Sequence, residues 1–346
     1  MTPAEAGSLA TTLVVALAGA ALFYLIGFPA AALTGAASAI TIASLAGLRV
    51  AMPDWLRVLT FVILGINIGT GVTPEMLRTA LLWPASIALL AASLVASMVV
   101  ARHGLQRWMG FGRAGATLAA APGHLSFVLA LSLDGAQGDT ARIAVVQSVR
   151  VLFLTLCVPL LVTVLFGATG VQVLPEDIVS PVSGAVLVAA TLLVGWLLLR
   201  LRVPAAYLLA GMGVSAAGHV MSLTPGRLPD AVTFVALLLM GTLIGSRFAG
   251  QTLSQIRSAM VAGVWVTAVS VAGAVAGIIV AMLALGLPPA LLIVAFAPGG
   301  VEAMAAIAIS LGLDPAFVAA HHVARLMLLT LIIPAMMHTA GPDTTR

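Results

Sequence analysis

Charge and cysteine are both scarce in this sequence. Only 8% of the 346 residues are charged, whereas a soluble domain carries roughly 25%. All fifteen basic residues are arginine, because the chain contains no lysine, and a single cysteine, Cys157, excludes an internal disulfide. The low charge excludes a surface that faces water throughout, and the scattered arginines form no basic face for nucleic acid.

Long apolar runs take the place of the missing charge. Hydrophobic residues make up 62% of the chain, and the mean hydropathy is +1.19. A membrane-spanning helix needs about 20 mostly apolar residues. Twelve such runs, in two sets of six, fall near 9–27, 30–48, 58–72, 79–101, 115–133, 143–166, 181–199, 203–222, 230–246, 258–286, 288–311 and 316–337. The sequence therefore predicts an all-α, polytopic membrane protein.

Two of these runs are interrupted by the same tripeptide. Ala121-Pro122-Gly123 and Ala297-Pro298-Gly299 lie 176 residues apart. Proline has no N–H to continue a helix, and the backbone groups freed at such a break cannot be satisfied by lipid. The breaks are therefore expected where protein, water or a ligand can satisfy the backbone.

The likeness between the two halves extends beyond the breaks. Between residues 139–159 and 314–334, eight of 21 positions are identical, and they include a shared Asp, Arg and Pro. Because shared polar residues are rarer than shared apolar ones in such sequences, we interpret the chain as a duplication. The predicted repeats are residues 1–170 and 171–346.

The arginines predict how the repeats are oriented. If the segment after each Ala-Pro-Gly enters and leaves by one face, each half has five crossings and the second half is inverted. Eleven arginines then share one side (Arg49, Arg57, Arg102, Arg107, Arg113, Arg142, Arg200, Arg202, Arg247, Arg257 and Arg346), and two, Arg78 and Arg227, lie on the other. Basic residues favour the cytoplasmic side, so both termini are predicted to be cytoplasmic. Each half is expected to hold about five transmembrane helices plus one broken or re-entrant segment.

Arg150 and Arg325 are the most informative side chains, because each lies inside an apolar run at the same place in its repeat. A central arginine costs about 2.5–3.5 kcal/mol on insertion scales. Two interpretations stay open: the arginines bind substrate, or they snorkel or cap the carbonyls of the broken helices. The predicted substrate-binding set comprises Arg150, Arg325, Gly123, Gly299, Gly300, Ser126, Gln147 and His322.

Three further residues are candidates for ion or proton coupling. Glu302 follows the second break near the start of a half-helix, where a carboxylate either caps the helix or carries a proton. Its counterpart in the first repeat is Ser126. His321 and His124 are the other candidates, since imidazole relays protons near neutral pH, although an interior histidine can equally be structural.

The assembled residues resemble a known family. "AFAPGGVEAMAAIAISLGLDPAFVAAHHVARLMLLTLIIPAM", with its weaker first copy "AAAPGHLSFVLALSLDGAQGDTARIAVVQSVRVLFLTLCVPLL", is similar to the duplicated AbrB-type membrane family of bacteria. The family is labelled an ammonia monooxygenase or an AbrB regulator affecting gene expression. The first copy departs from the pattern at His124 and Gln147.

These observations favour a secondary transporter of a small, anionic solute such as a carboxylate, coupled to protons or another ion. The alternatives are a membrane-bound ammonia monooxygenase and a membrane sensor that regulates gene expression indirectly. A copper or iron site needs two or three converging ligands, and the six histidines form no HxxxH or ExxH pair. We therefore expect no enzyme, no catalytic residue, no metal ligand and no cofactor. The expected partners are a small-molecule substrate, the bilayer of the bacterial inner (cytoplasmic) membrane and a second copy in a homo-oligomer, but no nucleic acid.

Overall fold

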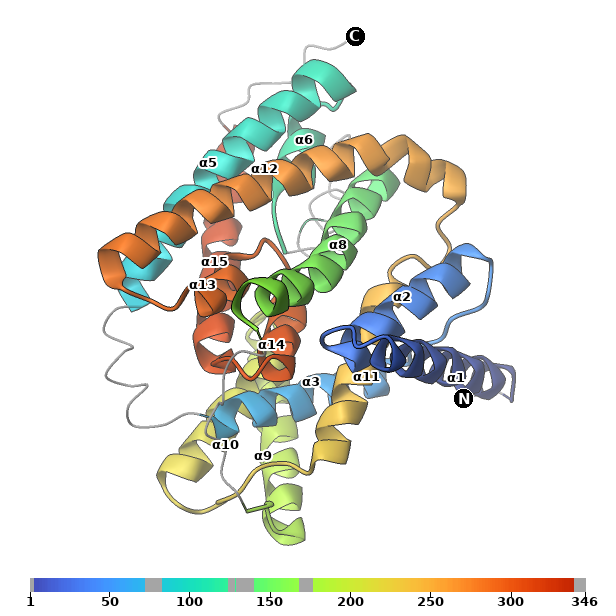
Figure 1. Cartoon of the computed structure of the whole chain (residues 1–346), viewed down its shortest axis with the longest axis vertical. Helices are drawn as coiled ribbons and strands as arrows, with labels where there is room; N and C mark the ends of the chain where they lie inside the picture. The colour runs from blue at the N-terminus through green and yellow to red at the C-terminus, as the bar shows by residue number, and fades with distance from the viewer. Residues whose placement is uncertain (1–2, 72–82, 124–127, 129–139, 168–176, 339–346) are drawn as a thin grey trace. The chain divides into compact units, whose positions relative to one another are not determined.

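The structure is a computed structural model that describes residues 3–71, 83–123, 128, 140–167 and 177–338. Within these residues it consists of thirteen helices and one isolated β-bridge, between Ile178 and Arg227 (Figure 1). The predicted all-α class is confirmed. Six of the helices in the described residues are long and apolar enough to cross a membrane: α1 (Pro3–Leu25), α5 (Trp83–Met109), α8 (Thr140–Phe166), α9 (Pro181–Arg200), α12 (Leu253–Leu285) and α15 (Pro315–His338).

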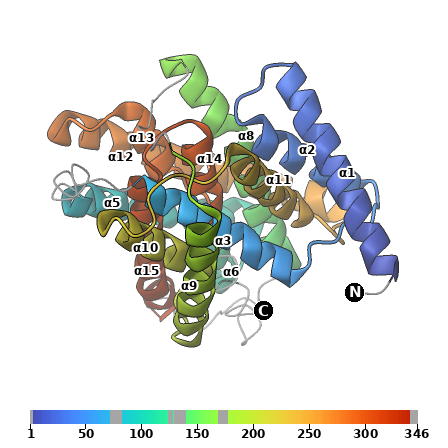
Figure 2. The ribbon, with the colours of Figure 1, turned by 90° about the horizontal axis from the view of Figure 1, so that it is seen from below.

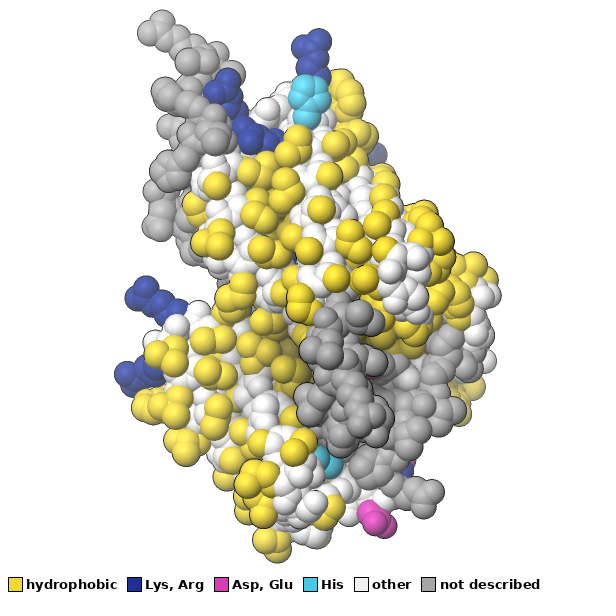
Figure 3. Space-filling view, turned by 90° about the vertical axis from the view of Figure 1, so that its left-hand side faces the viewer, with side chains coloured by type: hydrophobic (Ala, Val, Ile, Leu, Met, Phe, Trp, Pro, Cys, Tyr) yellow, Lys and Arg dark blue, Asp and Glu magenta, His cyan; other side chains and the backbone are white. Residues whose placement is uncertain are grey.

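The surface agrees with this assignment. Large apolar side chains are exposed on the long helices, for example Leu25 on α1, Leu283 on α12 and Leu331 on α15. Figure 3 shows hydrophobic side chains spread widely over one face of the described surface, with few charged groups among them. Exposed apolar area of this extent would aggregate in water but is stable against lipid. The chain is a multi-pass membrane protein.

The helices fall into two compact units. Unit 1 comprises residues 1–81, 155–249 and 301–320, and unit 2 comprises residues 82–154, 250–300 and 321–346. Unit 1 holds α1, α9, α2 (Ala31–Leu45), α3 (Asp54–Thr70), α10 (Ala206–Val220), α11 (Asp230–Ser246) and α14 (Val301–Ser310). Unit 2 holds α5, α12, α6 (Arg113–Ala120) and α13 (Pro289–Phe296), while α8 and α15 each pass from one unit into the other. Both units draw on both halves of the sequence, and the repeat boundary near residue 170 stays a prediction.

Glycines set the helix packing in unit 1. α3 packs on α10, and α11 packs on α2 (Figure 2). A β-carbon at Gly65 would overlap the carbonyl oxygen of Leu208, and one at Gly241 would overlap that of Leu33. One turn further along, Gly69 faces α10 and Gly245 faces α2 in the same way. Small residues four apart allow two backbones to approach closely, and the contact made by one half is repeated by the other.

These contacts also show the direction of the helices. Gly65 of α3 meets Leu208 of α10, and Gly69 meets Met212, so the residue numbers of the contacts increase together on the two helices. α3 and α10 therefore run parallel. The same advance from Gly241 to Gly245 makes α11 parallel to α2.

The starts of α2 and α10 repeat an unusual backbone conformation. Each helix begins at the last residue of a Pro-Ala-Ala stretch, and its N-cap alanine is left-handed, with φ 54° at Ala30 and φ 53° at Ala205. A residue with a β-carbon is strained in this region. Finding the same strained turn at the matching place in both halves supports their common origin.

In unit 2 the matching helices of the two halves pack against each other. α5 lies along α12 (Figure 1). Gly104 of α5 faces Trp265 of α12, whereas Ser97, seven residues earlier on α5, faces Gly273 further along α12. The Trp265 indole N–H also donates to the Ala101 carbonyl, 3.1 Å away. Because the residue numbers of the contacts rise along α12 as they fall along α5, the two helices are antiparallel.

Both Ala-Pro-Gly stretches end a short helix. α6 ends at Ala120 and α13 ends at Phe296, directly before the two tripeptides, and α14 begins at Val301 after the second break. The predicted interruptions in the runs near 115–133 and 288–311 are therefore confirmed as helix ends. The segment after the first break, apart from Val128, lies outside the described residues until Thr140.

Candidate functional site

The two breaks meet inside unit 2. Gly123 has a left-handed φ of 87°, and a β-carbon there would lie 2.6 Å from the carbonyl oxygen of Gly299. Both the conformation and the close approach require glycine. Gly123 and Gly299, predicted as site residues, thus bring the irregular backbones of the two halves into contact.

Arg325 binds the second break directly. Its Nη1 donates to the Ala297 carbonyl, 2.6 Å away, and its Nη2 lies against the Gly299 carbonyl and the Nδ1 atom of His322. The side chain is 1% exposed, so this cation is shielded from water. The guanidinium supplies the donors that the carbonyls at the end of α13 lack.

Arg150 repeats this arrangement at the first break. Its Nη2 donates to the Ala121 carbonyl, which is 2.9 Å away and stands where Ala297 stands in the second half. The same nitrogen donates to the Gln147 side-chain oxygen, also at 2.9 Å. Arg150 is fully buried.

The residue three positions before each arginine caps the same helix end. The Gln147 amide donates to Leu118 at 3.0 Å and Ala121 at 3.1 Å. The His322 Nε2 atom lies 3.0 Å from the carbonyl of Val294, which precedes the second break as Leu118 precedes the first. Four predicted site residues therefore provide hydrogen-bond partners for the backbone carbonyls at the two breaks. The capping interpretation describes their contacts, and their role in substrate binding stays a prediction.

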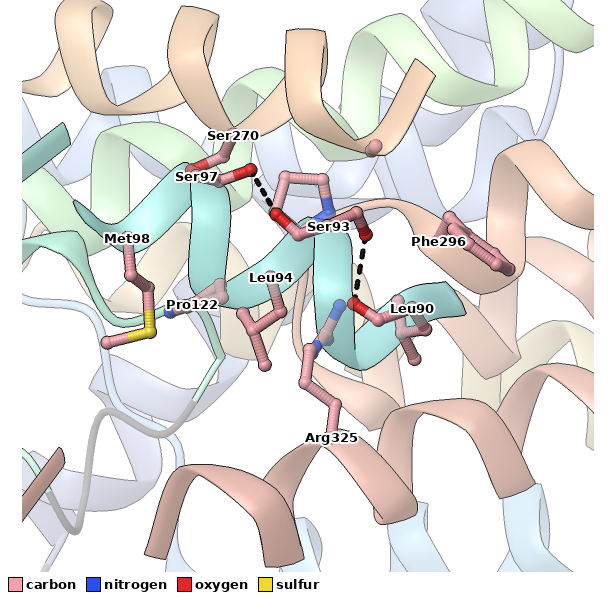
Figure 4. Close-up of a pocket in the computed structure, with 11 residues that line it drawn as sticks. Leu90, Ser93, Leu94, Ser97, Met98, Pro122, Ser270, Phe296 and Arg325 are labelled. Carbon is pink, nitrogen blue, oxygen red and sulfur yellow. Dashed lines mark hydrogen bonds between the residues drawn. The ribbon is translucent and has the colours of Figure 1, made fainter. Parts of the chain in front are cut away.

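A small cavity lies beside Arg325 in unit 2 (Figure 4). Its volume is about 20 Å³, enough for one water-sized group. Prolines of both breaks, Pro122 and Pro298, line it together with Ser93, Ser97 and Ser270. The Nε of Arg325 is buried and has no hydrogen-bond partner among the described residues. A buried donor without an acceptor is costly, so the cavity has an incomplete polar lining.

The serines of α5 offer acceptors to this cavity. Ser93 donates its hydroxyl hydrogen to Leu90 at 2.9 Å, and Ser97 donates to the backbone oxygen of Ser93 at 2.6 Å. Each hydroxyl keeps lone pairs after that donation. These serines were not predicted as site residues, although Ser86, Ser93 and Ser97 recur on one face of the apolar part of α5.

His321 occupies a separate buried position in unit 2. Its Nε2 lies 2.7 Å from the hydroxyl oxygen of Ser86. The rings of Trp83 and Phe296 are 6.5 Å and 6.2 Å from the imidazole, centroid to centroid. A polar contact within an aromatic enclosure fits a structural histidine as well as a proton relay, and the coupling role stays a prediction.

Glu302 belongs to unit 1, where its charge acts on Arg247. Burial lowers the pKa of Arg247, which lies just past the end of α11, and the Glu302 charge opposes that shift. Sequence reasoning missed Arg247 as a partner, although both residues lack a charged counterpart in the first half, where Gly71 and Ser126 stand. Pairing of Glu302 with Arg325, which belongs to unit 2, stays a prediction.

The other predicted site residues are accounted for as follows. Gly300 is buried at the end of the second break. His124 and Ser126 lie outside the described residues, so their predicted roles are untouched by the structure. The structure brings Gly123, Gly299, Gln147, Arg150, His322 and Arg325 together in unit 2.

Comparison with known proteins places this helical membrane protein in a family. The model of the family described as "Transition state regulatory protein AbrB" matches residues 33–340. The chain belongs to the AbrB family, as the sequence resemblance indicated. It is also similar to "Uncharacterized protein YhjN" of Bacillus subtilis (strain 168), with 28% identity over 239 residues. That match covers 62% of this chain and 60% of the relative.

Proposed function

We propose that the protein is a secondary transporter that carries a small anion, a carboxylate, across the bacterial cytoplasmic membrane. The observation that carries this proposal is the meeting of two broken helices around buried arginines in unit 2. Secondary transporters bind substrate at such breaks, where backbone groups are available away from lipid. Helix ends in lipid without a ligand or protein partner would be unstable.

The charge of unit 2 supports an anionic substrate. Arg150 and Arg325 are buried there, and the part of the unit that the structure describes contains no Asp or Glu. Backbone carbonyls and a Gln or His side chain offset part of the cost of burying these cations in a medium of low dielectric, but they carry no negative charge. A carboxylate would offset this positive charge, whereas a cation such as ammonium would add to it.

Inverted repeats are part of the proposal. The matching helices α5 and α12 are antiparallel, and α3 of the first half runs parallel to α10, the counterpart of α2. Both relations are expected when the second half is inverted relative to the first. They are the opposite of what two halves of equal orientation would give. On this proposal both termini are cytoplasmic.

Carboxylate binding tests the proposal directly. Purified protein should be stabilised against thermal unfolding by at least one of pyruvate, succinate, citrate and gluconate, because a ligand of the native state raises its stability. Arg325→Gln should abolish the effect. Arg325→Lys keeps the charge but loses the planar fork, and should weaken binding about tenfold or more, since a charged hydrogen bond contributes about 1.5–3 kcal/mol.

Arg102→Gln is the matched control, since Arg102 follows the part of α5 that lines the cavity and donates to the Met336 carbonyl of α15. It should bind as the wild type does. Normal binding by Arg325→Gln together with loss of binding in Glu302→Gln would mean that the site takes a cation, and would contradict the assignment.

A further inference from the structure

We propose that His322 is the proton-binding site of the transport cycle, and that its protonation releases Arg325 from the second break to bind the anion. This inference rests on the proposed function, because it names the coupling ion of that site. It assigns the coupling proton to His322, which the sequence predicted only as a substrate-binding residue, and not to Glu302, His321 or His124. The contacts of His322 carry the argument.

Both ring nitrogens of His322 have partners that fix the tautomer. Nε2 faces the Val294 carbonyl at 3.0 Å, and a carbonyl only accepts, so Nε2 carries the hydrogen. Nδ1 faces Nη2 of Arg325, and a guanidinium only donates, so Nδ1 carries the lone pair. His322 is therefore held neutral by its partners.

A proton on Nδ1 disrupts this arrangement. The new N–H meets the N–H of Arg325, and the imidazolium and guanidinium become adjacent like charges in a fully buried position. Among the described residues, the other titratable or charged groups that act on this pair are His321 on α15 and Arg150 on α8. α13 offers His322 only a carbonyl oxygen, and no described carboxylate in unit 2 relieves the repulsion.

The cavity gives Arg325 another partner. Arg325 already lines it, and its Nε points to no acceptor among the described residues (Figure 4). The cavity has room for one water-sized group, so the anion would have to widen it. An anion that enters beside Ser93, Ser97 and Ser270 would accept hydrogen bonds from the guanidinium. Arg325 can then exchange a contact with protonated His322 for a contact with the anion.

The first repeat lacks this switch. Gln147 performs both tasks of His322, donating to the helix carbonyls and accepting from Arg150. An amide does not titrate, so the first break keeps its arginine at every pH. The two breaks thus have matching contacts, but only the contacts of the second break respond to protons.

Proton and anion must then assist each other. If protonation frees Arg325 for the anion, a bound anion favours protonation of His322 by the same factor. One proton binds with one anion, and for a monocarboxylate the pair carries no net charge. Affinity for the anion should rise as pH falls.

Ring spectra of histidine-labelled protein test the first step without any substrate. In ¹⁵N NMR of the purified protein at pH 7.5, the His322 resonances, assigned by their loss in His322→Gln, should be those of the neutral Nε2–H tautomer. An imidazolium or an Nδ1–H tautomer at that pH would overturn the proposal. This readout stands even if no carboxylate binds, so its outcome is separate from that of the proposed function.

Anion affinity at two pH values tests the coupling. The carboxylate that stabilises the wild type most is used for this measurement. Its dissociation constant should be about tenfold lower at pH 5.5 than at pH 7.5, because anion binding takes up one proton over part of this pH range. His322→Gln, which copies the first repeat, should lose this dependence. Gln147→His, which copies the second, should make it steeper.

Glu302→Gln is the competing variant. If it loses the pH dependence while His322→Gln retains it, the proton binds at Glu302 and the proposal is wrong. Failure of every carboxylate to bind the wild type would instead reject the proposed function. Should His322→Gln not fold, the tautomer in the wild type and the steeper dependence of Gln147→His decide the question.

Discussion

Two arginines at the centre of a membrane protein need compensation, and here backbone carbonyls supply it. Arg325 and Arg150 each donate to the alanine carbonyl at a helix break, and a neighbouring His or Gln completes the cap. The same contacts leave Arg325 with an unused buried donor beside a cavity. A side chain can therefore be structural in one state and free to bind a ligand in another.

Asp314 illustrates capping at the residue scale. Its side-chain Oδ1 accepts from the backbone N–H groups of Ala316, at 2.9 Å, and Phe317, at 3.0 Å, at the start of α15. Asp314→Ala should lower the free energy of unfolding by about 1 kcal/mol, the usual value of such a cap, measured by thermal unfolding in detergent. Asp314→Asn keeps an acceptor and should lose less. Equal losses in the two variants would contradict the capping role.

This cap should also depend on pH. Burial raises the pKa of the Asp314 carboxyl, and the two backbone hydrogen bonds oppose the shift. With the pKa raised in the native state, the contribution of Asp314 to stability is present at low pH and falls as pH rises through that pKa. Asp314→Asn cannot titrate there and should lack this dependence.

At the residue scale the sequence identified the arginines of the site and offered carbonyl capping as one of their roles, but it did not identify the other residues that take part. Arg150 and Arg325 were evident because charge is rare in apolar runs and because the two positions matched. The carbonyls that Gln147 and His322 contact, those of Leu118 and Val294, were not evident, because they act through backbone oxygens that any residue carries. The cavity serines were missed because single hydroxyls are common in membrane helices, where they bond to their own backbone.

At the scale of helices, paired glycines explain why the two halves interlock. Gly65 and Gly69 meet α10 as Gly241 and Gly245 meet α2. Backbone contact at this range leaves no room for a methyl group. The packing of unit 1 therefore depends on glycine at four positions, two in each half.

Gly241→Ala tests this packing. A β-carbon would overlap the Leu33 carbonyl and come within 2.9 Å of the Ala36 β-carbon. We expect a loss of about 1–3 kcal/mol, typical of overpacking, seen as a lower unfolding temperature. Gly213→Ala is the matched control in α10, since no atom lies within 4 Å of its added β-carbon. It should be neutral or stabilising by up to about 1 kcal/mol, because alanine favours helix. A stable Gly241→Ala would show that the close contact is not required.

The sequence predicted where the helices lie better than it predicted which helices pack against each other. The run at 230–246 coincides with α11, and both Ala-Pro-Gly stretches end a helix as expected from proline. Hydropathy could not show that α3 packs on α10, or α5 on α12, because many helices share similar apolar faces. The glycine spacing carried that information, since it marks where backbones approach.

At the scale of the whole molecule, two sequence halves contribute to both compact units. Unit 2 takes the helix breaks from both halves, and unit 1 takes α2, α3, α10 and α11. Sequence analysis predicted repeats but could not predict this exchange, because it depends on contacts between residues more than a hundred positions apart. The exchange joins the two breaks in one unit, which is what a substrate site built on both halves requires.

Transport by reconstituted protein tests the central claim most directly. Proteoliposomes loaded with the unlabelled carboxylate that binds best should accumulate the same radiolabelled carboxylate from outside by counterflow, and Arg325→Gln proteoliposomes should not. Accumulation that needs intact Arg325 is the result that the transporter account predicts. Binding of the carboxylate by the same preparation without any counterflow would contradict it, and would indicate a membrane sensor.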